Sequence, residues 1–239
     1  MTLQLPLALR LRCPPRLDDF IVGQNQVVLT ALSRALQAGG EPLIFLAGPA
    51  GSGRTHLLSG QCAAGEALGL SSAYLPLREH RTLAPAMLQG LETMDLVTVD
   101  DVNAVAGQDD WEHALFTLFN NCREAGTRLL FSADQGPAGL PLQLPDLRTR
   151  LAWGLTLSLQ PLDDEGRRQL LQSLARRRAL SLPDDVARYM LDRTPRHPRE
   201  LVAIIDQLDR ASMAHQRPLT VPFVRDQLGL MADHIAGNG

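Results

Sequence analysis

The stretch LIFLAGPAGSGRTHLL, residues 43–58, runs from an apolar segment through a glycine-rich loop into a helical pattern. From Gly48 to Thr55 it has the spacing of a phosphate-binding loop, G-x-x-x-x-G-K-[ST], with Arg54 where that loop carries lysine. Backbone N–H groups between Gly51 and Thr55 would cradle phosphate oxygens, and the N-terminus of the following helix would add partial positive charge. The stretch therefore predicts a strand–loop–helix unit that binds a nucleotide through its phosphates.

Arginine at position 54 changes the chemistry that the loop can offer. Lysine is a compact point charge, whereas guanidinium is a broad planar fork. We expect Arg54 to keep the attraction for phosphate but to crowd a γ-phosphate more than a β-phosphate. All 23 Lys+Arg positions in this sequence are arginine, so drift in a chain without lysine is the alternative explanation for Arg54.

Apolar runs alternate with helical patterns from residue 43 to about residue 161, as they do in α/β folds. The runs that we predict as strands are Leu43–Ala47, Ser72–Leu77, Leu96–Asp100, Arg128–Ala133 and Leu155–Leu159. Largely apolar runs suit strands that are buried on both faces of a parallel sheet. The segment DDWEHALFTLFNNCREAG has apolar residues at helical spacing, and Gly126 closes it. We therefore expect a three-layer α/β domain with a five-stranded parallel sheet.

The pattern changes after Pro161, because no strand-like run follows. Helical segments are predicted at about 163–179, 184–193, 198–215 and 221–229. Asp163 and Asp184 are candidate N-caps, and Pro222 suits the first turn of a helix. The sequence thus predicts a small all-helical domain at 162–239, after an α/β domain at 13–161 and a tail at 1–12.

Composition narrows the class of protein. Hydrophobic residues make up 45% and charged residues 21%, the formal net charge is -3, and no long basic tract marks a nucleic-acid surface.

Cys13, Cys62 and Cys122 suit buried free thiols in a reducing compartment. No apolar run reaches the roughly 20 residues that span a bilayer. Arginines follow the apolar N-terminal run, the reverse of a secretory signal, so we expect a cytoplasmic protein.

A second acidic motif follows the loop. MDLVTVDDV, residues 94–102, is an apolar strand that ends in Asp100 and Asp101 and resembles a Walker B strand. In that pattern Asp100 supports Mg²⁺ together with the Thr55 hydroxyl, and Asp101 takes the place of the residue that positions the attacking water. Capping of a following helix by the two carboxylates is the alternative, and the preceding phosphate loop disfavours it.

These motifs and their flanks resemble the AAA+ superfamily, and within it the DnaA family of replication initiators with its shortened Hda-type regulators. The segments that carry the resemblance are LDDFIVGQNQVVLTAL (17–32), GRTHLL (53–58), LLFSAD (129–134), DLRTRLAWGLTLSLQPL (146–162) and RHPRELVAIIDQLDRA (196–211). An initiator would continue into a DNA-reading helix-turn-helix domain, whereas this sequence ends with the helical lid, which favours the Hda-type branch.

The resemblance implies ADP or ATP and Mg²⁺ as cofactors and assigns a role to individual residues. The nucleotide-binding residues would be Phe20, Ile21, Val22, Gly48, Pro49, Ala50, Gly51, Ser52, Gly53, Arg54, Thr55, His56 and the sensor 2 residue Arg199. Asp134 would be the sensor 1 residue. Arg150 would be an arginine finger for a neighbouring subunit. Arg148, two residues earlier, is the other arginine in this segment and would not fill that role. Pairing of Arg150 with a surface carboxylate is the alternative.

The tail QLPLAL, residues 4–9, looks like the peptide by which proteins dock on the sliding clamp of the replicase. The anchors would be Gln4, Leu5, Leu7 and Leu9, because extended peptides use alternate side chains to fill pockets. So short a motif also arises by chance. Its place ahead of the folded domain favours the docking peptide.

The resemblance as a whole implies a negative regulator of replication initiation. Bound to nucleotide and tethered to the DNA sliding clamp, it would stimulate ATP hydrolysis by DnaA, with weak hydrolysis of its own and no sequence-specific DNA binding. It could also form a homo-oligomer. A self-sufficient AAA+ ATPase that loads or remodels a replication partner is one alternative, and an adaptor that binds nucleotide without catalysis is another.

Overall fold

The computed structural model describes the chain from residue 16 to residue 236, with side chains as far as residue 229. The chain forms two compact units that meet between Pro161 and Leu162. The first unit is built on a sheet, and the second contains helices only.

A five-stranded parallel sheet forms the centre of the first unit, in the order β2-β3-β4-β1-β5. The strands are β1 Leu43–Ala47, β2 Ser72–Pro76, β3 Leu96–Asp100, β4 Arg128–Ala133 and β5 Leu155–Ser158. Every residue of β1 and of β3 is buried, as expected for apolar strands covered on both faces. The predicted α/β fold is confirmed. Strands β2 and β5 each end one residue earlier than predicted, and Leu77 instead begins a 3-10 turn, η3, Leu77–Thr82.

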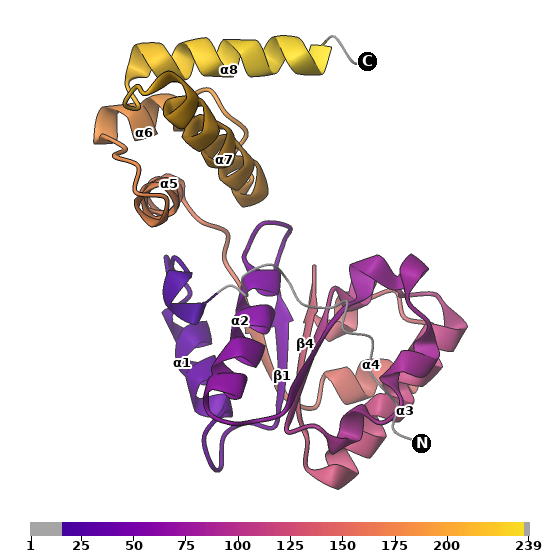
Figure 1. Ribbon diagram of the computed structural model, residues 1–239. Coiled ribbons are helices and arrows are strands. Elements are labelled where there is room, and N and C mark those ends of the chain that lie inside the picture. Colours follow the sequence, from indigo (N-terminus) through magenta and orange to yellow (C-terminus); the bar gives the residue numbers. More distant parts are fainter. Residues whose placement is uncertain (1–15, 237–239) are drawn as a thin grey trace. The chain divides into compact units, whose positions relative to one another are not determined.

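Helices cover both faces of the sheet (Figure 1). Helices α1, Gln26–Ala35, and α2, Arg54–Ala67, share one hydrophobic core with the sheet. Helices α3, Asp109–Ala125, and α4, Pro145–Leu151, share the core on the opposite face. The shorter 3-10 turns are η2 Leu17–Asp19, η4 Pro85–Leu88, η5 Leu91–Thr93, η6 Val102–Ala104 and η7 Pro137–Gly139. Gly126 ends α3 in the left-handed conformation, as predicted.

The second unit packs its helices around a small apolar core of its own. The helices are α5 Asp164–Arg177, α6 Asp184–Leu191, α7 Pro198–His215 and α8 Val221–Ala236. The core contains Leu171, Met190, Ile205 and Val224, one from each helix. Helix α8 extends beyond the predicted end at 229.

Two of the three predicted features of helix starts are confirmed in this unit. The Asp163 side chain caps α5 by accepting a hydrogen bond from the Gly166 backbone N–H at 2.7 Å. Pro222 lies in the first turn of α8. The prediction for Asp184 is wrong, because Asp184 is the first residue of α6 and its carboxylate pairs with Arg168 and Arg188 instead of capping the helix.

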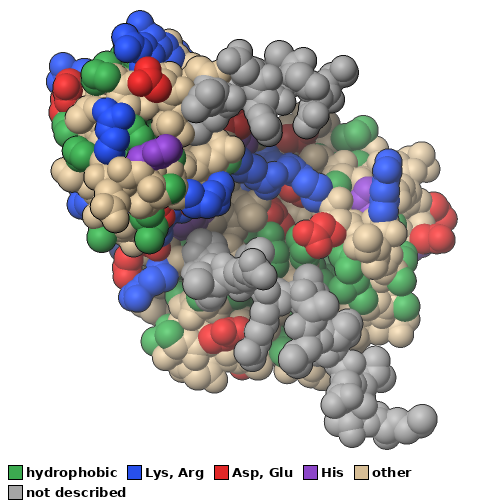
Figure 2. Space-filling view, turned by 45° about the horizontal axis from the view of Figure 1, so that its top comes forward, with side chains coloured by type: hydrophobic (Ala, Val, Ile, Leu, Met, Phe, Trp, Pro, Cys, Tyr) green, Lys and Arg blue, Asp and Glu red, His purple; other side chains and the backbone are tan. Residues whose placement is uncertain are grey.

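Charges of opposite sign lie side by side on the surface, as Figure 2 shows for one face. In the second unit Arg178 pairs with Asp206, and Arg168 bridges Glu165 and Asp184. Such pairs are typical of solvated helix faces. No helix in the described part of the chain is long and apolar enough to cross a membrane.

The two cysteines within the described residues are free and buried, as predicted. Burial raises the pKa of Cys122 to about 12, and it raises the pKa of Cys62 as well. Both thiols therefore stay protonated and behave as small apolar side chains. Cys13 lies outside the described residues.

Candidate nucleotide site

The phosphate loop joins the end of β1 to the start of α2. Gly51 and Gly53 have φ angles of 81° and 98°, which favour glycine. A Cβ atom on Gly53 would lie 2.6 Å from Cε2 of Phe20, and one on Gly48 would lie 2.8 Å from Oγ of Ser52. The loop is therefore wound tightly against its own side chains and against the lead-in segment, and glycine is required at both places.

An unpartnered donor in this loop supports its fit to phosphate. The Ser52 hydroxyl is buried and has no hydrogen-bond partner among the described residues. Buried polar groups are nearly always satisfied, so an orphaned hydroxyl inside a glycine loop indicates a place where a ligand atom belongs. The N-terminus of α2, which begins at Arg54, adds unsatisfied backbone N–H groups at the same place. Loop and helix together form a cradle for phosphate oxygens.

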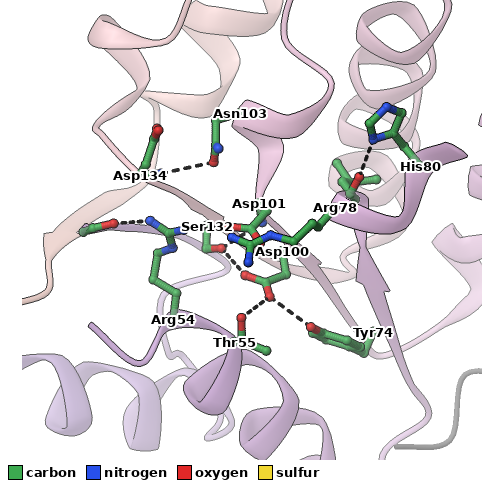
Figure 3. Close-up of polar contacts among 12 residues, drawn as sticks. Arg54, Thr55, Tyr74, Arg78, His80, Asp100, Asp101, Asn103, Ser132 and Asp134 are labelled. Atoms are coloured by element: carbon green, nitrogen blue, oxygen red, sulfur yellow. Dashed lines mark hydrogen bonds and ion pairs between the residues drawn. The ribbon is translucent and has the colours of Figure 1, made fainter. Parts of the chain in front are cut away.

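Asp100, the last residue of β3, accepts hydrogen bonds from three hydroxyl groups (Figure 3). Its Oδ2 accepts hydrogen bonds from the Thr55 hydroxyl at 2.6 Å and the Tyr74 hydroxyl at 2.9 Å. Its Oδ1 accepts a hydrogen bond from the Ser132 hydroxyl. Burial, together with the charge of Asp100, raises the pKa of Tyr74, so that hydroxyl remains a donor.

The donor set at Asp100 fits Mg²⁺ held mainly by phosphate and water. Mg²⁺ prefers oxygen ligands and commonly takes one or two protein groups besides substrate phosphates. Asp100 and Thr55 supply a carboxylate and a hydroxyl in direct contact, beside the phosphate cradle. Among the described residues no group of three or more His, Cys, Asp or Glu side chains could hold a metal by itself. The site therefore suits Mg²⁺ that arrives with a nucleotide.

Asp101 is held by two arginines. Its Oδ1 lies 2.6 Å from Nη2 of Arg54, and its Oδ2 lies 3.0 Å from Nε of Arg78. The residue has φ 58° and ψ 53°, the left-handed conformation that few non-glycine residues adopt. Although Asp101 precedes the turn η6, its side chain makes no capping hydrogen bond. The helix-capping alternative is therefore wrong for Asp101, because both of its carboxylate oxygens face guanidinium groups.

Arg54 ties the loop to Asp101, the residue that follows β3 (Figure 3). Its side chain is only 6% exposed. One terminal nitrogen donates to the Gly48 carbonyl at the start of the loop, and the other pairs with Asp101. A guanidinium with two protein acceptors is fixed in place, which a single ammonium group could not achieve in the same way. Arg54 is therefore a structural bridge within the loop.

The lead-in segment lies against the loop. The Phe20 ring approaches Gly53 and lies 5.8 Å from the His56 ring, and His56 Nε2 lies 2.9 Å from the Arg16 carbonyl oxygen. Buried Asn25 bonds both backbone groups of Gln160, at 2.9 and 2.8 Å, and so fixes the segment beside the exit of β5. The residues between them, Ile21 and Val22, are half-buried. Phe20, one of the three predicted adenine-side residues, thus lies against the phosphate loop.

The predicted sensor 1 residue and arginine finger occupy separate surroundings. Asp134 is exposed just after β4, and its backbone N–H donates to Oδ1 of Asn103 at 3.2 Å. Arg150 lies in the last turn of α4 with its guanidinium 4.0 Å from the centre of the Trp153 ring. Within the described residues Arg150 has no carboxylate partner at salt-bridge distance, so the surface-pair alternative is wrong there. Arg148 instead donates to the Leu142 carbonyl.

The remaining predicted residues belong to the second unit or fall outside the described part of the chain. Arg199 is exposed in the first turn of α7, in the second unit, and its backbone N–H donates to Nδ1 of His197 at 3.2 Å. The clamp-binding anchors Gln4, Leu5, Leu7 and Leu9 lie outside the described residues.

The sequence analysis missed several residues that contact the predicted site residues. They are Tyr74, Arg78, Asn103, Ser132 and Trp153. Ser132 lay within the predicted sensor 1 strand and Trp153 within the segment that carries Arg150, so their motifs could have pointed to them. Arg78 had no such signal, because its role depends on a contact between separate turns.

Two family models match the chain in different parts. The model of the bacterial DnaA ATPase domain matches residues 77–158, which include β3, β4, α4 and β5. The model described as the lid domain of Hda matches residues 164–228, which include α5, α6 and α7. The boundary between the two matches coincides with the boundary between the two compact units.

Solved structures of replication initiators have a similar fold. Domain III of the replication initiation protein DnaA from Thermotoga maritima matches with a TM-score of 0.77 and 21% identity, over 92% of this chain and 98% of that one. A DNA replication initiation factor matches with a TM-score of 0.70 and 23% identity, over 82% and 64%. AMPPCP-bound DnaA from Aquifex aeolicus matches with a TM-score of 0.66 and 24% identity, over 80% and 63%. This chain thus spans less than two thirds of the last two proteins.

Proposed function

We propose that this chain, a DnaA- and Hda-related AAA+ protein, holds an adenine nucleotide in its own site and stimulates hydrolysis of the ATP bound to DnaA. Adenine is favoured because a DnaA of similar fold carries AMPPCP, an adenine nucleotide analogue. The glycine loop and Ser52 would hold its phosphates, and Phe20 would lie near its base. Thr55 and Asp100 would hold Mg²⁺, which when bound neutralises phosphate charge.

The pairing of Asp101 with Arg54 and Arg78 is the observation that supports retention of a nucleotide in this chain's own site. A residue that positions water must present a free carboxylate oxygen, and both oxygens of Asp101 are engaged. Arg54 also bridges the loop at Gly48, which favours a diphosphate over a triphosphate in the place beside it. The site is therefore suited to retaining a nucleotide, with weak hydrolysis of its own.

Catalysis in the proposed complex would occur at the edge shared with DnaA. Arg150 points to no carboxylate of its own chain among the described residues, so its positive charge is available to a partner. Placed beside the ATP of an adjacent DnaA subunit, its guanidinium would neutralise charge on the transferring phosphoryl oxygens. Conversion of the ATP form of DnaA to the ADP form would make this protein a negative regulator of replication initiation.

The purified protein should contain bound ADP and should hydrolyse added ATP slowly. Replacing Asp100 by asparagine should weaken Mg²⁺-dependent nucleotide binding by about 10–100-fold, because a carboxylate that supports the metal is lost. The neighbouring Asp101→Asn variant should change the basal hydrolysis rate little, since Asp101 is already engaged. Chromatography of the released nucleotide and a phosphate-release assay measure both quantities, and circular dichroism confirms folding.

Rapid basal turnover that disappears in the Asp101→Asn variant would contradict this assignment. It would show that Asp101 leaves its arginine partners and positions water. The protein would then be a self-sufficient ATPase of the loader or remodeller class. Retained nucleotide with no effect on DnaA, even beside loaded clamp, would instead make it an adaptor.

Tethering to the sliding clamp through residues 4–9 would bring this protein to newly replicated DNA. A tether raises the effective concentration of a weakly bound partner, which here would be DnaA near the clamp. The proposal rests on the spacing of Gln4, Leu5, Leu7 and Leu9 in the sequence.

The double substitution Gln4→Ala, Leu5→Ala should abolish binding to the clamp while leaving nucleotide affinity unchanged. The reason is that the anchors precede the folded domain and fill pockets on the clamp. Co-elution with purified clamp in gel filtration measures the effect. Leu3→Ala, which removes an aliphatic side chain just before the peptide, is the matched control and should bind normally. Co-elution of the double variant with clamp would show that docking uses another surface.

A further inference from the structure

Trp153 is an exposed aromatic side chain that the proposed function does not use. It follows α4, and half of its surface is exposed, which is unusual for a large ring. The other tryptophan, Trp111, is buried in α3 with 5% exposure. Trp153 contributes little to the apolar core in comparison, so its place at the surface calls for a different role.

Two guanidinium groups lie over the Trp153 ring. Arg150 lies 4.0 Å from the ring centre and Arg123, from the last turn of α3, lies 4.7 Å from it. The Phe119 ring meets Trp153 edge-on at 6.1 Å, which fixes the indole from the side of the core. Trp153 is therefore a rigid platform, and Arg150 is the nearer of the two cations on it.

We infer that Trp153 is a positioning residue that holds the Arg150 guanidinium ready for the active site of the neighbouring subunit. Arginine has a long, flexible side chain, and ordering it at the moment of catalysis would cost conformational entropy. Stacking on an aromatic face keeps a guanidinium charged and exposed while restricting its rotamers. A carboxylate partner would also hold the arginine, but it would neutralise the charge that a phosphoryl group needs.

Arg123 provides a matched comparison on the same ring. It belongs to a different helix and lies outside the segment that resembles the arginine-finger box. Its removal should leave the Arg150 stack in place. Comparison of the Arg123→Ala and Arg150→Ala variants therefore distinguishes a general effect of positive charge near Trp153 from the specific positioning of Arg150.

This inference rests on the proposed function, and the test uses the full chain with DnaA–ATP and DNA-loaded clamp. Trp153→Leu should lower the maximal rate of stimulated hydrolysis about fivefold, the loss expected for one exposed cation–aromatic contact, with no change in the half-saturating concentration. Trp153→Phe should recover most of the rate, because an aromatic face remains. Arg123→Ala should stimulate normally.

A second readout needs no DnaA. Acrylamide quenching of tryptophan fluorescence reports mainly the exposed Trp153, and Arg150→Ala should increase it by uncovering the ring. Unchanged quenching would show that the two side chains do not stack in solution and would overturn the inference.

The kinetic outcomes are equally distinct. Full stimulation by Trp153→Leu, alongside loss of stimulation in Arg150→Ala, would overturn the positioning role and leave the proposed function standing. A raised half-saturating concentration with an unchanged maximal rate would make Trp153 a docking residue instead, which also overturns it. Full stimulation by Arg150→Ala would refute the proposed function itself, and the positioning role would fall with it.

Discussion

Replacing Arg150 by alanine should eliminate stimulated ATP hydrolysis by DnaA while leaving nucleotide binding and clamp binding intact. The expected loss is roughly 10³–10⁵-fold in rate, the range for arginine fingers that act in trans. Its contacts are with Trp153 at 4.0 Å and Phe116 at 5.9 Å, so its removal breaks no ion pair seen among the described residues. A phosphate-release assay with DnaA–ATP and loaded clamp measures the effect.

Arg148→Ala is the matched control, two residues earlier on the same helix. The Arg148 guanidinium donates to the Leu142 carbonyl, so it supports the loop before α4. Its removal should cost about 1 kcal/mol of stability, as for one hydrogen bond, and should lower stimulation far less than Arg150→Ala. If Arg148→Ala abolished stimulation and Arg150→Ala did not, the finger would have to be reassigned to Arg148.

The sheet was predictable because its strands are short apolar runs, which are stable only when they are buried inside the domain. Strands β1, β3 and β4 have the predicted bounds, and β1 and β3 are buried along their whole length. The start of α6 was less predictable. Asp184 has the composition of an N-cap, but the Arg168 side chain from α5 competes for its carboxylate. A local capping preference is weak enough for a tertiary ion pair to override it.

The loop, Thr55 and Asp100 were predictable from motif spacing, whereas the role of Arg78 was not. In the parallel register of β2 and β3, Pro76 lies opposite Asp100. The residues that follow each strand therefore meet, and Arg78 in η3 reaches Asp101. This pairing depends on where two strands end relative to each other. The spacing of residues within one motif does not reveal where two strands end relative to each other. The pairing of Asp101 with both Arg54 and Arg78 could therefore be found only from the three-dimensional structure.

Replacing Arg54 by alanine should lower the free energy of unfolding of the first unit by about 3 kcal/mol, because it leaves a buried carboxylate without its closest partner. Arg54 and Asp101 are 6% and 4% exposed, so water cannot readily replace the lost guanidinium. Arg78 still pairs with the other oxygen of Asp101, which keeps the loss at the lower end of the range for broken buried pairs. Urea unfolding followed by tryptophan fluorescence measures this unit, since Trp111 and Trp153 both belong to it.

Arg78→Ala is the control, because it removes a cation from the same carboxylate. Its side chain is 51% exposed, so the pair is screened by solvent, and the loss should stay below about 1 kcal/mol. Arg54→Met combined with Asp101→Leu removes both buried charges and should recover most of the stability, because no unpaired charge remains. Equal losses from Arg54→Ala and Arg78→Ala would contradict the role of Arg54 as the principal partner. Failure of the double variant to recover stability would show that Arg54 acts through the Gly48 carbonyl, as a bridge across the phosphate loop, more than through Asp101.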